Sequence, residues 1–219
     1  MTLDNPLDQL GAVDRALSTR EHLGRTARVL TAEQHYPTDA DDLWEALTTP
    51  ERLQRWFLPL EGDLRVGGSY QLVGNAGGTI ERCDAPRSFA ITWEYGGGVS
   101  WVEVDLTPTD GGTDLVLTHI AHVDGFAETY GPGAVGVGWD MTLMGLHAHV
   151  VSGEANDPSA FEAWGTSDEG KAYVTRSSEL WGQADAADGT DPAVAQARAE
   201  RTAAFYRGEE VPQVQPQDG

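Results

Sequence analysis

The sequence has little or none of several features that would place a protein in a specialised class. Its single cysteine, Cys83, excludes an internal disulfide and any zinc site built from several cysteines. No apolar run reaches the roughly 18–20 residues that a transmembrane helix needs. Residues 1–10 lack the basic and apolar regions of a signal peptide. Together these absences predict a cytoplasmic protein.

Positive charge is also scarce. The 219 residues include 14 Lys and Arg against 35 Asp and Glu, a formal net charge of −21, and Lys171 is the single lysine. A chain with so few cations repels phosphate backbones and anionic lipid surfaces. The composition therefore argues against nucleic acid and membranes as partners. Because the acidic residues are spread along the chain, they are expected to form a solvated surface.

Composition and patterning divide the chain into four segments. Residues 1–24 are a polar lead-in, in which Asp4–Ser18 is expected to be a short helix or a frayed segment. Residues 25–152 carry dense strand signals and then a helix, which predicts one folded domain. Residues 153–210 contain no convincing strand and predict a helical extension. Residues 211–219 have the composition of a disordered tail.

The middle segment has the pattern of an antiparallel meander. A strand over Arg25–Tyr36 precedes two short helices that begin after Asp39 and at Pro50. Residues 88–95 then alternate strictly between apolar and small or polar side chains, the period of a half-buried strand. Glycine-rich breaks of hairpin length separate the further strands, which are expected at Ser69–Val73, Thr79–Cys83, Ser88–Tyr95, Ser100–Leu106 and Thr113–Val123.

A long helix is predicted from about Pro132 to Ser152. It places Trp139, Leu143, Leu146 and Val150 on one narrow stripe. A single amphipathic helix after a curved meander is expected to lie on the concave face of the sheet and to leave a cavity beneath it. Residues 131–136 match the spacing GxGxxG, but an antiparallel setting does not suit a dinucleotide site, so they are interpreted as a helix start.

A set of short motifs within residues 25–152 resembles the START-like (SRPBCC) superfamily, and within it the family of the C-terminal domain of the Hsp90 ATPase activator. The matching pieces, in order, are Leu43-Trp44, Ala46-Leu47-Thr48, Pro50-Glu51, Arg55-Trp56-Phe57, Gly67-Gly68-Ser69-Tyr70, Pro86, Thr92-Trp93, Gly112-Thr113, Leu117-Thr118-His119 and Gly138-Trp139. The resemblance implies the helix-grip fold, an α+β fold in which a curved antiparallel sheet surrounds a long C-terminal helix. The chain departs from the family pattern at Ala85, where a second proline is usual, and at Arg82, near a position that is often acidic.

The histidines do not have the spacing of a metal site. His119 and His122 are three apart on a strand and point to opposite faces, whereas His147 and His149 are two apart on a helix, about 200° around it. No metal and no cofactor is therefore predicted. Residues expected to line the cavity share aromatic or apolar character or offer a polar group to orient a ligand, and are Trp56, Tyr70, Arg82, Trp93, His119, Trp139, Leu143 and His147.

Three functions remain open at this point. The first is binding of a small, largely apolar molecule in the cavity. The second is an enzyme of the cyclase or dehydratase type, with His119 or His147 as acid or base. The resemblance to the START-like superfamily implies it because some START-like relatives are polyketide cyclases, and the sequence has no nucleophile signature. The third is a protein-interaction module, because the resemblance to the Hsp90 activator implies contact with a chaperone.

The C-terminal extension is not usual in the family that the motifs resemble. Trp101 shares a strand face with Glu103 and Asp105, so it is expected on the outer face of the sheet with a cover over it. The extension is the candidate cover. In order of preference, it is expected to pack on the outer face, to contact a second subunit in a homodimer, or to cap the cavity mouth.

Overall fold

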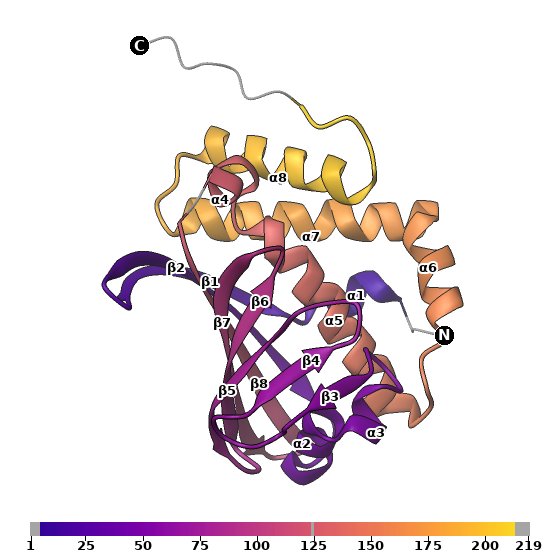
Figure 1. Ribbon diagram of the computed structural model, residues 1–219. Coiled ribbons are helices and arrows are strands. Elements are labelled where there is room, and N and C mark those ends of the chain that lie inside the picture. The colour runs from indigo at the N-terminus through magenta and orange to yellow at the C-terminus, as the bar shows by residue number, and fades with distance from the viewer. Residues whose placement is uncertain (1–4, 124, 213–219) are drawn as a thin grey trace.

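The computed structural model describes residues 5–123 and 125–212 of the chain. Within this part, one antiparallel sheet has eight strands in the order β1-β2-β8-β7-β6-β5-β4-β3 (Figure 1). The strands are β1 Asp14–His22, β2 Arg25–Tyr36, β3 Leu60–Gly62, β4 Ser69–Leu72, β5 Gly77–Asp84, β6 Ser88–Tyr95, β7 Gly98–Thr109 and β8 Gly112–His122. The predicted antiparallel α+β architecture is confirmed.

The sheet buries the face that the alternation of residues 88–95 indicated. Along β6, Phe89, Ile91 and Trp93 pack against the main core, as do Val102 and Val104 on the neighbouring β7. The first predicted strand, β2, pairs with the last, β8, over ten residue pairs from Ala27↔His122 to Tyr36↔Thr113. This pairing places the first and last strands predicted from the sequence side by side in the sheet.

Two strands were not predicted. The sequence predicts a helix or a frayed lead-in here, but β1 pairs with β2 along its full length through a turn at Leu23 and Gly24, both with positive φ. Six of its nine residues are exposed, so its sequence has little apolar alternation. The helix in the N-terminal segment is limited to α1, Pro6–Gly11, and Asp4 lies outside the described residues. β3 has three residues, too few to give a periodic signal.

Three helices cover the concave face. α2 (Ala40–Thr48) is capped by Asp39, which accepts a hydrogen bond from the Asp42 amide at 2.9 Å, and α3 (Pro50–Leu53) begins at Pro50. The long helix α5 (Gly133–Ser152) ends at Gly153, whose φ of 70° suits a glycine. Its predicted stripe faces the sheet, with Trp139, Leu143 and Leu146 buried in the main core and Val150 packed against it.

The C-terminal segment forms α6 (Pro158–Thr166), α7 (Asp168–Ala187) and α8 (Pro192–Tyr206), with the short α4 (Gly125–Tyr130) before α5. In Figure 1, α7 and α8 lie side by side near the end of α5 that is remote from α2 and α3. They pack on α5, α4, α1 and β1, so the expectation that the extension covers the outer face of the sheet is wrong. Of the predicted tail at residues 211–219, positions 213–219 lie outside the described residues.

Trp101 does lie on the outer face, and it is covered, but by other residues. Its ring contacts His22, at the end of β1, with ring centroids 4.3 Å apart, and His122 of β8 at 5.1 Å. It forms a small cluster with Ala27, Val29 and Ile120. The missed strand β1 therefore supplies the cover that the sequence had assigned to the extension.

Candidate functional site

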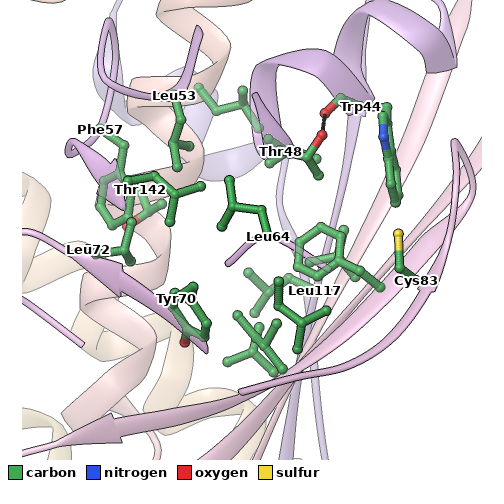
Figure 2. A pocket seen from close by; sticks show the side chains of 18 of the residues that line it. Trp44, Thr48, Leu53, Phe57, Leu64, Tyr70, Leu72, Cys83, Leu117 and Thr142 are labelled. Atoms are coloured by element: carbon green, nitrogen blue, oxygen red, sulfur yellow. Dashed lines mark hydrogen bonds between the residues drawn. The ribbon is translucent and has the colours of Figure 1, made fainter. Parts of the chain in front are cut away.

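A cavity of about 540 Å³ lies between the concave face of the sheet, α5 and the two short helices α2 and α3 (Figure 2). Its floor is made by side chains of β4 to β8 and its roof by α5. Most of these side chains are aliphatic or aromatic. The wall includes Trp44, Leu47, Leu53, Trp56, Phe57, Tyr70, Leu72, Ile80, Phe89, Ile91, Trp93, Val102, Val104, Leu115, Leu117, Trp139, Thr142, Leu143 and Leu146.

Several side-chain donors on this wall are already hydrogen-bonded within the protein. The Tyr70 hydroxyl donates to the Thr92 carbonyl at 2.7 Å, and the Trp56 Nε1–H donates to the Ala46 carbonyl at 2.9 Å. The hydroxyls of Thr48 and Thr142 each donate to the carbonyl four residues earlier in their own helix, to Trp44 and Gly138 respectively. Because these donors are satisfied, the wall presents a largely apolar surface to an occupant.

The mouth of the cavity lies between α2, the loop of residues 63–67 and the end of β5. Leu64 and Val66 are 40% and 53% exposed there, and Figure 2 shows the Leu64 side chain between the helices and the sheet. Arg65 is the only charged side chain among the described lining residues, and it pairs with Asp63 at 2.8 Å. Cys83 is exposed and borders the cavity, and Figure 2 shows it next to Trp44. The mouth is thus lined by apolar side chains together with one cation and one thiol.

Five of the eight residues predicted from the sequence line this cavity. They are Trp56, Tyr70, Trp93, Trp139 and Leu143. Trp93 and Trp139 pack against each other, with ring centroids 5.0 Å apart, and close the cavity at the end remote from α2. The structure brings these five together because the inward positions of the sheet face the stripe of α5.

Arg82 does not line the cavity. A β-bulge between Ile80 and Arg82 shifts the pairing with β6, so that Arg82 pairs with Ala90 while Ile80 pairs with Ile91. The extra residue turns Arg82 to the outer face, where it contacts Ser88 and reaches Glu103 of β7 at 4.0 Å. The same bulge turns Cys83 toward the cavity, so the expectation for Arg82 is corrected and Cys83 takes its place.

His119 lies behind the cavity wall. It is 4% exposed, and its Nδ1 accepts a hydrogen bond from the Trp139 Nε1–H at 3.0 Å. Burial lowers its pKa to about 4, so the imidazole is neutral at pH 7. Trp139 therefore stands between His119 and the cavity, and the expected orienting role for His119 in that cavity has no support.

His147 is also outside the wall. It lies on α5 with its ring 6.1 Å from that of Tyr36, and burial lowers its pKa. Tyr36 is fully buried and its hydroxyl donates to the Leu143 carbonyl at 3.2 Å. His147 thus packs beside the core and not over the cavity.

Several lining residues escaped the sequence prediction, and a usable signal existed for some of them. Phe89 and Ile91 share the alternation that selected Trp93, and Trp44 and Phe57 share the apolar faces of the two helices predicted from the sequence. Cys83 carried no such signal, because its direction depends on the bulge.

The curved sheet, the long helix and the apolar cavity between them define a helix-grip domain. A sequence model of the family described as "Activator of Hsp90 ATPase homolog 1-like protein" matches residues 37–150, more than half of the chain. The protein belongs to this family, as the motifs predicted. A comparison with curated proteins finds no match.

The match to some solved structures covers more of the chain than the family model does. The crystal structure of CalU16 from Micromonospora echinospora is 34% identical, with a TM-score of 0.63, and the match covers 79% of this chain and 98% of that one. The solution structure of the same protein is 31% identical with a TM-score of 0.69, covering 86% and 100%. Protein MLL2253 from Mesorhizobium loti, 20% identical with a TM-score of 0.50, covers 55% and 95%, and shares the fold.

No helix in the described residues is long and apolar enough to span a membrane. Those residues also contain no group of three or more His, Cys, Asp or Glu side chains placed to hold a metal ion.

Proposed function

We propose that this protein binds a small, largely apolar molecule in the cavity between the sheet and α5. The observation that carries the proposal is the apolar character of the cavity wall. Its aromatic and aliphatic side chains surround about 540 Å³, and the donors of Tyr70, Trp56, Thr48 and Thr142 are already used within the protein. An occupant with many polar groups would lose its water hydrogen bonds there without replacing them.

The size of the cavity supports a small-molecule occupant. Ligand sites commonly measure roughly 300–1,000 Å³, and this cavity is within that range. Transfer of apolar surface out of water contributes about 25 cal/mol for each Å², so a molecule that fills the space is held mainly by burial. Arg65, at the mouth, is placed to meet a polar or anionic end that stays near solvent.

The two alternatives have weaker support. An acid–base enzyme needs a titratable group that faces the bound molecule, and both candidate histidines lie outside the wall. Contact with a chaperone is suggested by the family's name alone. A homodimer and a cytoplasmic location remain predictions from the sequence.

Cys83 allows a direct test, because it is the chain's single cysteine and it borders the mouth. The probe is the neutral, apolar fluorophore N-phenyl-1-naphthylamine, titrated into the purified 219-residue protein. We expect its fluorescence to rise on binding. Prior reaction of Cys83 with a bulky maleimide should lower probe affinity by at least about tenfold, which corresponds to about 1.4 kcal/mol. Bound probe should in turn slow the reaction of Cys83 with the maleimide.

Two controls separate occlusion of the cavity from general damage. The Cys83→Ser protein, treated with the same reagent, should bind the probe as the untreated protein does. A Cys83→Ser, Val151→Cys protein carries the label at an exposed helical site that is absent from the cavity wall, and should also keep its affinity. Equal probe binding with and without the label on Cys83 would contradict the proposal.

A further inference from the structure

Behind the wall formed by Trp93 and Trp139 lie two adjoining hollows of about 530 and 470 Å³. Both are bordered by Trp93, His119, Ala134 and Val135. The first opens beside α6 and the second beside α4 and the turn between β6 and β7. Together they form the rear cleft, named here for its position behind the two tryptophans. It is separate from the cavity of the proposed function and borders the other face of the same wall.

His119 gives the rear cleft a fixed hydrogen-bond donor. The Trp139 indole can only donate, so the Nδ1 atom of His119 that receives its hydrogen bond must be the unprotonated nitrogen. The neutral ring therefore carries its proton on Nε2. That N–H has no hydrogen-bond partner among the described residues, although the side chain is 4% exposed. His119 borders both hollows, so this N–H can donate to an acceptor that enters the rear cleft.

The two hollows are lined by aromatic and apolar side chains together with charged ones, which include Arg55, Asp157 and Glu162 in the first and Arg28, Asp185 and Arg198 in the second. The first hollow is bordered by Trp139, Phe57, Phe161 and Tyr206 in addition to Trp93. The rim of the second carries large apolar side chains that are unusually exposed, at 65% for Tyr95, 51% for Val99 and 49% for Phe126. Flat aromatic rings are well suited to pack between such side chains.

We propose that the rear cleft is a second binding site, specific for an aromatic molecule that carries a carbonyl oxygen. The rings of Trp93 and its neighbours hold the aromatic part, and the carbonyl accepts the hydrogen bond of His119 Nε2–H. Trp139 fixes the tautomer, so the site presents a donor and disfavours a ligand whose only polar group is itself a donor. The hollow volumes suit a small molecule.

The matched probes are 2-acetylnaphthalene and 2-ethylnaphthalene, which have the same ring system and differ in the carbonyl. Binding is measured by calorimetry on the full chain, after Cys83 has been blocked with a bulky maleimide so that the other cavity is closed at its mouth. We expect 2-acetylnaphthalene to bind about 5- to 10-fold more tightly, the effect of one neutral hydrogen bond. Equal affinities for the two probes would overturn the proposal. Its outcome does not depend on whether the cavity behind Cys83 binds a ligand.

Two substitutions test whether the preference for the carbonyl probe depends on the Nε2 atom of His119. In His119→Asn, the amide reaches the position of Nδ1 and keeps an acceptor for Trp139, but no donor reaches the position of Nε2. In His119→Gln, the amide reaches the position of Nε2 and keeps a donor there. The preference for the carbonyl probe should disappear in His119→Asn and persist in His119→Gln. Persistence in His119→Asn would overturn the assignment to His119.

A measurement on the unmutated side chain covers the case in which His119→Asn does not fold. In protein labelled with ¹⁵N-histidine, the Nε2–H resonance of His119 is the one missing from the spectrum of His119→Gln. It should shift on addition of 2-acetylnaphthalene and stay in place with 2-ethylnaphthalene. An unmoved resonance at saturating 2-acetylnaphthalene would also overturn the proposal.

Discussion

The two sides of helix α5 differ in how closely they are packed. Toward the sheet, it presents Trp139, Leu143 and Leu146 to a curved apolar surface and leaves a cavity of about 540 Å³. Toward the C-terminal extension, it presents Gly136 and Asp140, and the gap is closed by Trp181 and its neighbours on α7. The same helix is thus loosely covered on one side and tightly packed on the other.

Side-chain shape explains the difference. Gly136 lets the Trp181 ring approach so closely that an added Cβ would lie 2.5 Å from ring atoms. The Asp140 carboxylate accepts hydrogen bonds from Arg15 Nη2 at 2.9 Å, Trp181 Nε1 at 3.0 Å and the Ser177 hydroxyl at 2.5 Å. Directional polar contacts and a small residue hold α7 at one distance. Toward the sheet, the side chains of Trp139, Leu143 and Leu146 instead line a cavity of about 540 Å³.

The largest effect is expected at Asp140. Asp140→Ala removes the counter-charge of Arg15, whose side chain is 5% exposed, and leaves a buried guanidinium without its carboxylate. We expect the free energy of unfolding to fall by about 3–5 kcal/mol, measured by urea denaturation. In the double variant Arg15→Met, Asp140→Leu both charges are gone, so the loss should be smaller. A double variant as unstable as Asp140→Ala would contradict this account of the tightly packed side.

His119 provides the corresponding test on the sheet side, where the buried polar group has no counter-charge. Its pKa is lowered from an ordinary value near 6.5 to about 4 by burial. Between these values the unfolded chain binds more protons than the folded one, so the free energy of unfolding falls as the pH decreases. From pH 7 to pH 5 the His119 contribution is about 2 kcal/mol.

The measurement compares urea denaturation at pH 7 and pH 5 for the wild type and His119→Gln. The variant should lose less stability on acidification, because glutamine does not titrate, while all other groups remain in both proteins. Identical pH dependence in the two would show that the folded protein binds a proton at His119 as readily as the unfolded chain does.

The smallest effects come from adding one methyl group to either side of α5. Gly136→Ala places a Cβ against the Trp181 ring and should cost about 1–2 kcal/mol, even after the gain in helix propensity. Gly145→Ala meets its nearest neighbours, in Asn156 and Trp56, at 3.5 Å, an ordinary contact. It should stabilise the protein by about 0.5–1 kcal/mol. Thermal unfolding of the matched pair tests the comparison, which fails if both substitutions shift Tm in the same direction.

The regular elements of the domain were predictable because their signals are local. The alternation of residues 88–95 located β6, and the spacing of Trp139, Leu143 and Leu146 located the buried face of α5. The same patterns selected five side chains that line the cavity. The edge strand β1 was missed because six of its nine residues are exposed, so burial left too short a period in its sequence to be recognised.

The directions of some side chains, and the position of the C-terminal extension, depend on contacts between segments that are distant in the sequence. The bulge in β5 follows from its pairing with β6, and it exchanges Arg82 for Cys83 at the cavity. The position of the extension depends on Asp140 meeting residues of β1 and α7, which are more than 30 residues away in the chain.

The sequence by itself determined the family, the antiparallel sheet and the helix that crosses it. These elements are buried on one face, and that burial produces a regular spacing of apolar residues within each segment. Only the tertiary structure decided which side of α5 is filled and which is hollow, and on which side of the Trp93–Trp139 wall His119 stands. The physical reason is that packing depends on how side chains from separate segments fit in three dimensions, and no stretch of sequence contains that information alone.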